Sequence, residues 1–184
     1  DLALAARAAQ HDVAARSEVA ERLFDRVRAM AGYLAGGKPC AEDFAQQALV
    51  EILLGLHTFR GESSLESWAD RIAARAIMRQ LRRRRTLLGR FRLFARAEED
   101  QEVPTRRPEH DLDDMTLIRA RLAVVLGKLD EKRRVAIVLK LLHGYSIEEI
   151  AAMTNTRENT VRDRLRRGRK ELRASIRRDP LLHD

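Results

Sequence analysis

The sequence is poor in the residues that form disulfides, turns and aromatic clusters. Among 184 residues there are one cysteine and four prolines, and aromatic residues make up 4%. The single thiol, Cys40, excludes an internal disulfide and fits a reducing compartment. No apolar run approaches the roughly 20 residues that a membrane span needs, and Leu2–Ala9 is too short and interrupted for a signal peptide. We therefore expect a cytoplasmic protein without membrane insertion.

Signatures of catalysis are also missing. None of the five histidines stands one helical turn from another histidine or the cysteine, so the spacing does not indicate a metal site. Gly36-Gly37 is only a break between helices, and no glycine-rich phosphate loop occurs. Cys40 has no identifiable basic partner that would activate it as a nucleophile. The sequence predicts no catalytic residues, no metal, no cofactor and no enzymatic activity.

Charge, in contrast, is abundant and unbalanced. Charged residues make up 35% of the chain, hydrophobic residues 45%, and the formal net charge is +8. The richness in alanine, leucine, glutamate and arginine favours an all-helical protein. An excess of arginine suits a polyanion such as nucleic acid. A membrane surface attracts the same charge, so the sign alone leaves the partner open.

Helical spacing of apolar residues predicts an all-α fold of two helical domains joined by a flexible linker. We place the first domain at 1–85, the linker at 86–114 and the second domain at 115–184. The linker is poor in core-forming residues from Glu98 onward. Its first part, Leu87–Phe94, either docks on a partner or extends the preceding helix, and the sequence leaves both readings open.

Residues 146–172, SIEEIAAMTNTRENTVRDRLRRGRKEL, predict a helix-turn-helix. Ser146 and Glu149 have the spacing of a capping box. Asn155 tolerates the left-handed backbone of a tight turn, and Thr156 is the predicted cap of the second helix. That helix has an apolar stripe backed by polar and basic residues, as a helix in the major groove of DNA requires. The alternative is an ordinary charged surface helix.

The first domain carries a row of arginines and a polar helix face. Arg71, Arg75, Arg79 and Arg82 share one side of the helix predicted at 65–85, a ladder that can follow a phosphate backbone. The loop before it offers a pocket for an unstacked base. The alternative is a solvated arginine face, with Trp68 in the core. The polar face within AEDFAQQALVEIL looks, on pattern alone, like ordinary surface.

Two long segments resemble one known family. AEDFAQQALVEIL, followed by FRGESSLESWADRIAARAIMRQLRR, resembles region two of sigma-70 family proteins of the extracytoplasmic-function (ECF) group. LGKLDEKRRVAIVLKLLHGYSIEEIAAMTNTRENTVRDRLRRGRKELR is similar to region four of that group. The resemblance implies a bacterial transcription initiation factor that binds core RNA polymerase and directs promoter recognition and DNA opening. It implies core RNA polymerase and promoter DNA as partners, and it allows an anti-sigma protein as a third.

The resemblance also implies roles for individual residues. Those implied to bind polymerase are Asp43, Gln46 and Gln47. Those implied to bind the downstream promoter element as a single strand are Phe59, Arg60, Ser63, Ser64, Arg71, Arg75 and Arg79. Those implied to bind the upstream element as duplex are Arg157, Asn159, Thr160, Arg162, Arg164, Arg166 and Arg167. The chain departs from the family pattern at Arg75, where asparagine is usual, and in the turn Thr154-Asn155-Thr156.

Two other functions compete with this one. A stand-alone helix-turn-helix regulator accounts for residues 146–172 but leaves the first domain without a task. A nuclease built on Asp111, Asp113 and Asp114 requires catalytic carboxylates inside a predicted linker, which argues against it.

Overall fold

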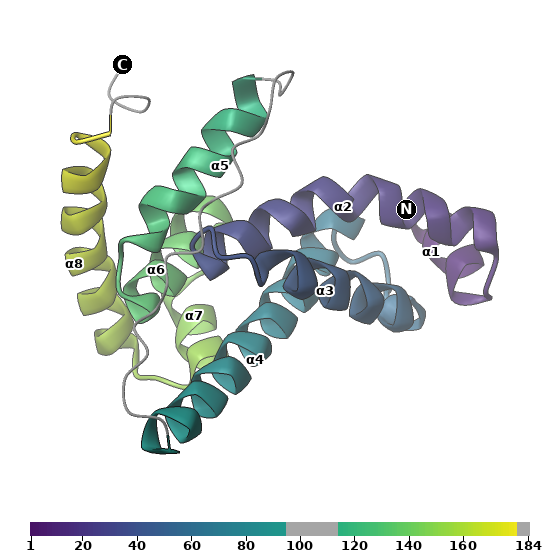
Figure 1. Ribbon diagram of the computed structural model, residues 1–184. Coiled ribbons are helices and arrows are strands. Elements are labelled where there is room, and N and C mark those ends of the chain that lie inside the picture. Colours follow the sequence, from purple (N-terminus) through teal and green to yellow (C-terminus); the bar gives the residue numbers. More distant parts are fainter. Residues whose placement is uncertain (95–113, 180–184) are drawn as a thin grey trace. The chain divides into compact units, whose positions relative to one another are not determined.

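The computed structural model describes residues 1–94 and 114–179 (Figure 1). Every regular element within these ranges is helical, which confirms the predicted all-α class. The elements are α1 (Leu2–Ala9), α2 (Val13–Ala35), α3 (Ala41–Gly55), the 3₁₀ turn η1 (Leu56–Thr58), α4 (Leu65–Phe94), α5 (Asp114–Gly127), α6 (Glu131–Ile137), the π-helical turn η2 (Val138–Leu142), α7 (Ile147–Thr154) and α8 (Glu158–Ile176). Within the same ranges, no helix combines the length and apolar character needed to cross a membrane.

Contacts divide the chain into two compact units. One unit comprises Asp1–Ala31 and Glu42–Pro104, and the other comprises Gly32–Ala41 and Thr105–Asp184. Most of the predicted linker, including Asp111 and Asp113, lies outside the described residues. Its start at residue 86 is helical instead, because α4 continues to Phe94. Leu87–Phe94 therefore extends the preceding helix, one of the two readings that the sequence left open.

The core of the first unit is built from the apolar stripes of α2, α3 and α4. The fully buried side chains on α2 include Val19, Leu23 and Val27, which follow each other at four-residue spacing. Ile52 on α3 and Ile77 on α4 are equally inaccessible. Burying such side chains contributes about 1.5–3 kcal/mol each relative to leaving them exposed. This core fixes the faces that α3 and α4 turn to solvent.

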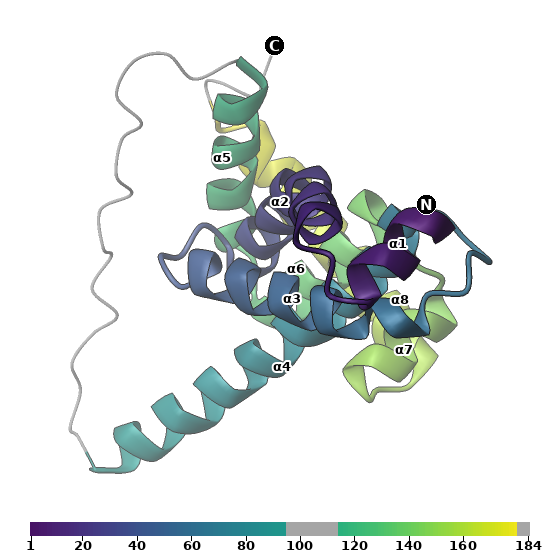
Figure 2. The ribbon, with the colours of Figure 1, turned by 90° about the vertical axis from the view of Figure 1, so that its right-hand side faces the viewer.

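Helix α1 and the segment after α3 support each other in the same unit. α1 contacts η1 and lies beside the loop that joins η1 to α4 (Figure 2). Gly61 in that loop has a φ of +73°, and a Cβ built on it would lie 3.6 Å from Leu2 Cδ1. The left-handed backbone at this position favours glycine. The loop is thus packed on the first turn of α1.

The second unit places α8 across α6 and α7. Its core includes Leu126, Ile137, Leu139, Ile150 and Val161. Asp130 caps α6 by accepting the Lys132 N–H at 3.1 Å, as its position predicts. Just beyond the end of α8, Asp179 is 2% exposed, and its two carboxylate oxygens share the N–H of Arg121 Nε of α5, at 2.8 and 2.9 Å.

Two local expectations are wrong in this unit. Helical spacing in the sequence places Leu142 on one apolar stripe with Val135, Val138 and Leu139, but Leu142 is 42% exposed. The cause is the π-helical turn Val138–Leu142, since its wider turn shifts the register of the residues that follow. Thr156 does not cap α8. Its hydroxyl pairs with that of Thr154 at 2.8 Å, and Arg157 occupies the N-cap position without a side-chain cap.

Candidate nucleic-acid interface

The helix-turn-helix forms with the local geometry that its residues predict. Ser146 Oγ accepts the Glu149 N–H at 3.1 Å, and Glu149 Oε2 accepts the Ser146 N–H at 2.8 Å, which completes the capping box. Asn155 ends α7 with φ 50° and ψ 53°, in the left-handed region. Thr154 also donates to the Ile150 carbonyl at 2.7 Å. The polar turn that departs from the family pattern is therefore held by hydrogen bonds of its own.

Helix α8 has one buried and one basic face. Helical spacing predicts an apolar stripe of five residues, of which Val161, Leu165 and Gly168 are buried, while Leu172 and Ile176 are half-buried. Six of the residues predicted to contact duplex DNA are exposed: Arg157, Asn159, Thr160, Arg162, Arg166 and Arg167. Arg164 is only half-buried, on the flank nearer to the core. The exposed set can reach base edges and phosphates without any rearrangement of the core.

Ion pairs along α8 fix the direction of these arginines. Arg162 donates to Glu158 at 2.9 Å and to Asn159 Oδ1 at 3.0 Å. Asp163 accepts from Arg166 at 2.8 Å and forms an ion pair with Arg167 at 2.9 Å. These hydrogen bonds, chiefly the one from Arg166, lower the pKa of the Asp163 carboxyl. A DNA phosphate that binds either arginine must compete with this carboxylate.

The basic surface extends beyond the predicted residues. A groove of about 740 Å³ runs along α8 and has an apolar floor that includes Ile147 and Leu165. Its cationic residues are Lys140, Arg162, Arg166, Arg169, Lys170, Arg173 and Arg177. Those on α8 recur mostly at three- and four-residue spacing, a signal that the sequence contained and that the site prediction did not use. Lys140 comes from the π-helical turn, which no sequence pattern indicated.

In the first unit, the loop before α4 separates a buried ring from exposed polar groups. Phe59 is 7% exposed, and its ring meets Trp68 edge-on with centroids 5.5 Å apart. A covered ring presents no free face on which a base can stack, so Phe59 serves to hold the loop. Arg60 and Ser64 are exposed, and Ser63 is half-buried. The loop therefore offers polar side chains at its surface and an aromatic pair beneath.

The predicted arginine row lies on the solvent face of α4. Arg71, Arg75 and Arg79 are all exposed. Arg71 Nη2 donates to Ser63 Oγ at 3.2 Å, which joins the row to the loop. Arg79 forms an ion pair with Glu51 of α3. Beyond it, Arg79, Arg82, Arg83 and Thr86 line a shallow hollow of about 520 Å³. Loop and row thus form one continuous basic surface.

Helix α3 turns its polar face outward. Asp43, Gln46 and Gln47 are exposed. Val50 and Leu54 follow on the same side of the helix and are 48% and 63% exposed. The three polar residues are thus brought together with two apolar residues that the sequence analysis did not single out. Among the described residues, no group of three His, Cys, Asp or Glu side chains is placed to hold a metal ion.

These features define a class of protein: an all-helical DNA-binding factor with a helix-turn-helix in one unit and a basic helix with its loop in the other. Comparison with known families agrees. The chain matches the family described as Sigma-70 region 2 over residues 19–86 and that described as Sigma-70, region 4 over residues 119–172. The chain belongs to the sigma-70 family, in the ECF group.

Curated relatives share this assignment. The chain is 33% identical over 158 residues to the ECF RNA polymerase sigma factor SigE of Mycolicibacterium smegmatis, covering 85% of this chain and 59% of that protein. It is 27% identical over 161 residues to the ECF RNA polymerase sigma factor SigX of Bacillus subtilis, covering 83% of this chain and 79% of the relative. The chain thus spans less than two thirds of the length of SigE.

Two solved structures have a similar fold. CnrH, solved in complex with the cytosolic domain of CnrY, has a TM-score of 0.55 at 25% identity, over 97% of this chain and 98% of CnrH. The sigma factor RpoE of Bartonella quintana, solved with the anti-sigma factor NepR, has a TM-score of 0.57 at 24% identity, over 89% of this chain and 97% of RpoE.

Proposed function

We propose that this chain binds core RNA polymerase and directs it to promoters. It reads one part of the promoter as duplex DNA and another part as an unpaired strand. The observation that carries the proposal is the presence of two separate basic surfaces, one on a helix-turn-helix and one on a helix with an adjoining loop. The first suits duplex DNA and the second suits an unpaired strand. Neither task makes or breaks a covalent bond, so the chain acts as a binding factor without catalysis. It works in the cytoplasm, where bacterial RNA polymerase works.

The upstream element is read as duplex by α8. Its exposed arginines, Asn159 and Thr160 face base edges, while the groove cations beyond Arg166 contact phosphates. Phosphate contacts fix the register of the helix on the duplex, and base contacts select the sequence. The Asp163 pairs weaken non-specific binding, because each phosphate contact must first break a charge-assisted hydrogen bond.

The downstream element is captured as a single strand by the loop and α4. Arg71, Arg75 and Arg79 follow the phosphate backbone. Arg60, Ser63 and Ser64 contact a base that leaves the stack. Capturing that base stabilises the open state of the promoter, because the energy of unstacking is repaid by contacts that the duplex does not make.

Polymerase docks on the exposed face of α3. Asp43, Gln46 and Gln47 supply hydrogen-bonding groups, and Val50 with Leu54 supply apolar area on the same side. A polar set beside apolar area is the usual composition of a protein interface. The similar sigma factor RpoE of Bartonella quintana was solved in complex with the anti-sigma factor NepR. We include an anti-sigma protein among the proposed partners of this chain.

Charge reversal on α3 tests the docking. Asp43→Arg should abolish co-purification with core RNA polymerase, because the reversed charge faces the partner. Glu42→Arg is the matched control, since Glu42 is exposed one residue away on another side of α3. Retention of full binding by Asp43→Arg, or equal loss with both variants, contradicts the assignment.

A further inference from the structure

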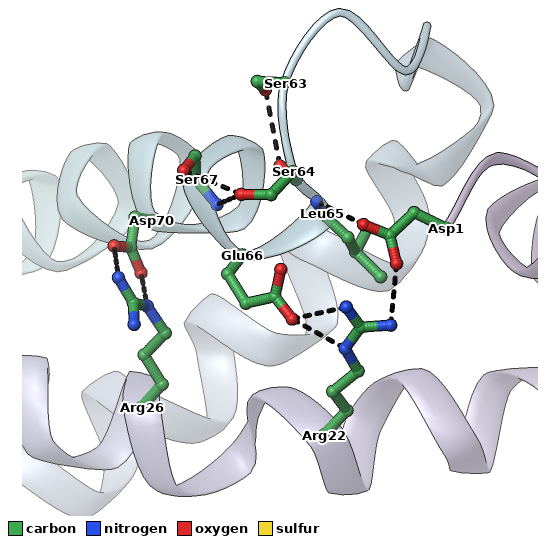
Figure 3. A network of polar contacts seen from close by, with 9 residues as sticks. All are labelled: Asp1, Arg22, Arg26, Ser63, Ser64, Leu65, Glu66, Ser67 and Asp70. Carbon is green, nitrogen blue, oxygen red and sulfur yellow. Dashed lines mark hydrogen bonds and ion pairs between the residues drawn. The ribbon is translucent and has the colours of Figure 1, made fainter.

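A network of charged side chains holds the first turn of α4 (Figure 3). Arg22 of α2 lies between two carboxylates: its Nη1 is 2.7 Å from Asp1 Oδ1, and its Nε donates to Glu66 Oε1 at 2.6 Å. Asp1 Oδ2 in turn accepts the backbone N–H of Leu65 at 3.2 Å. The three side chains come from the start of α1, from α2 and from α4. They join these elements at the residue that follows the loop.

The remaining donors of this helix end are also taken. The Ser67 N–H donates to Ser64 Oγ at 3.2 Å, and Ser64 Oγ lies 2.8 Å from Ser67 Oγ. Glu66 accepts its own backbone N–H, and this hydrogen bond, together with Arg22, lowers the pKa of its carboxyl. A helix start with unused N–H groups binds phosphate readily. Here those groups are used within the protein, so the loop must act through its side chains.

The loop between η1 and α4 is therefore held at its beginning, at its middle and at its end. At its beginning, the ring of Phe59 is packed against Trp68. In its middle, Gly61 rests on Leu2 of α1. At its end, Ser64 immediately precedes Leu65, whose N–H is bound by Asp1. The Asp1–Arg22–Glu66 network thus acts at Leu65, the residue next to Ser64.

A second arginine pair on the same two helices provides a comparison. One turn further along, Arg26 donates to both oxygens of Asp70, each at 2.7 Å (Figure 3). Asp70 is 6% exposed. Breaking this pair removes two charge-assisted hydrogen bonds from a buried carboxylate, which is destabilising. The two arginines are similarly exposed, 40% for Arg22 and 47% for Arg26, but the carboxylates that Arg22 binds are more open, at 31% for Asp1 and 29% for Glu66. Such exposed pairs contribute little to stability.

The geometry points to Asp1, Arg22 and Glu66 as positioning residues that set which base the loop accepts. This inference rests on the proposed function, in which the loop captures an unpaired base. The planar guanidinium bridges two carboxylates at once, whereas the ammonium of lysine is a single point charge. The network thus holds the loop end in one place, while the Arg26–Asp70 pair holds the two helices together.

The test measures base preference and stability separately. The full chain, in complex with core RNA polymerase, is given a pool of single-stranded oligonucleotides randomised across the captured element, and bound sequences are counted. Arg22→Gln and Arg22→Lys are compared with the matched control Arg26→Gln, and Arg60→Ala reports on the loop itself. Urea unfolding of each variant follows its stability.

We expect Arg22→Gln to reduce the preference for the favoured base several-fold, because the end of the loop loses this anchor. The unfolding midpoint should change little, because exposed ion pairs contribute little to stability. Arg22→Lys should retain stability without restoring the preference. Arg26→Gln should lower the midpoint and leave the preference intact.

Other outcomes overturn the inference in distinguishable ways. If Arg60→Ala flattens the preference and Arg22→Gln does not, the network has no positioning role, and the proposed function stands. If Arg22→Gln and Arg26→Gln reduce the base preference equally, both arginine pairs are merely structural. If Arg60→Ala also leaves it unchanged, the loop does not read a base, and both proposals fail.

Discussion

Gly168 is where α8 passes close to α6, and replacing it by alanine tests the packing that presents the recognition face. A Cβ at this position would lie 2.9 Å from Ile137 Cγ1, 3.3 Å from Ile137 Cδ1 and 3.4 Å from Arg133 Cβ. The first distance is shorter than carbon atoms tolerate. Ile137 is 1% exposed, so its side chain is enclosed by neighbouring atoms. Either this side chain or the two helices must shift to admit the methyl group.

Two opposing effects set the size of the change. Alanine in a helix interior is more favourable than glycine by about 1 kcal/mol. Overpacking a close contact costs about 1–3 kcal/mol. We expect packing to prevail, so that Gly168→Ala lowers the free energy of unfolding by about 1 kcal/mol.

Urea unfolding measures this change, and the neighbouring residue calibrates it. Arg169 is exposed on the same helix, so the difference between Arg169→Gly and Arg169→Ala gives the helix propensity alone. The cost of Ile137→Ala should also be smaller in the Gly168→Ala background, because the truncation removes the clash. The reasoning is refuted if Gly168→Ala stabilises the protein by the amount that the Arg169 variants define.

Three further predictions concern charge. Arg167→Ala should weaken binding to the upstream duplex by about 1–3 kcal/mol if Arg167 reads a base; an unchanged affinity and base preference in a mobility-shift titration removes that role. Asp163→Asn should tighten binding to duplex of arbitrary sequence, because it releases Arg166 and Arg167; unaltered non-specific affinity shows that the pairs do not compete with phosphate. The carboxyls of Glu66 and Asp163 have pKa values lowered on folding. The stability that they contribute is therefore present at neutral pH. It is lost as the pH falls through their folded pKa values, below the usual range near pH 4. Urea midpoints that stay constant or rise on acidification contradict this.

Local signals in the sequence were sufficient for most of the helices and for the N-caps of α6 and α7, though not for that of α8. Val19, Leu23 and Val27 are buried because four-residue spacing places them on one face, whatever the partner. The Ser146–Glu149 box and the left-handed Asn155 form because they depend only on neighbouring backbone. The residues of α8 that face the core were predictable for the same reason.

Features that depend on distant contacts were not predictable. The π-helical turn at Val138–Leu142 leaves no pattern in the apolar spacing, so Leu142 was assigned to the core. Phe59 was expected to contact DNA, but its burial depends on Trp68, nine residues later. Arg22 and Glu66 look like ordinary surface charges in the sequence, and only the packing of α2 against α4 brings them together.

The most direct test of the account is transcription from genomic DNA of the source bacterium by core RNA polymerase, with and without this chain, read by sequencing the 5′ ends of the transcripts. The account predicts new start sites that depend on the chain and lie a fixed distance downstream of one shared two-part sequence. If the chain adds no start sites, or if the new starts share no sequence, its assignment as a promoter-reading subunit of RNA polymerase is contradicted.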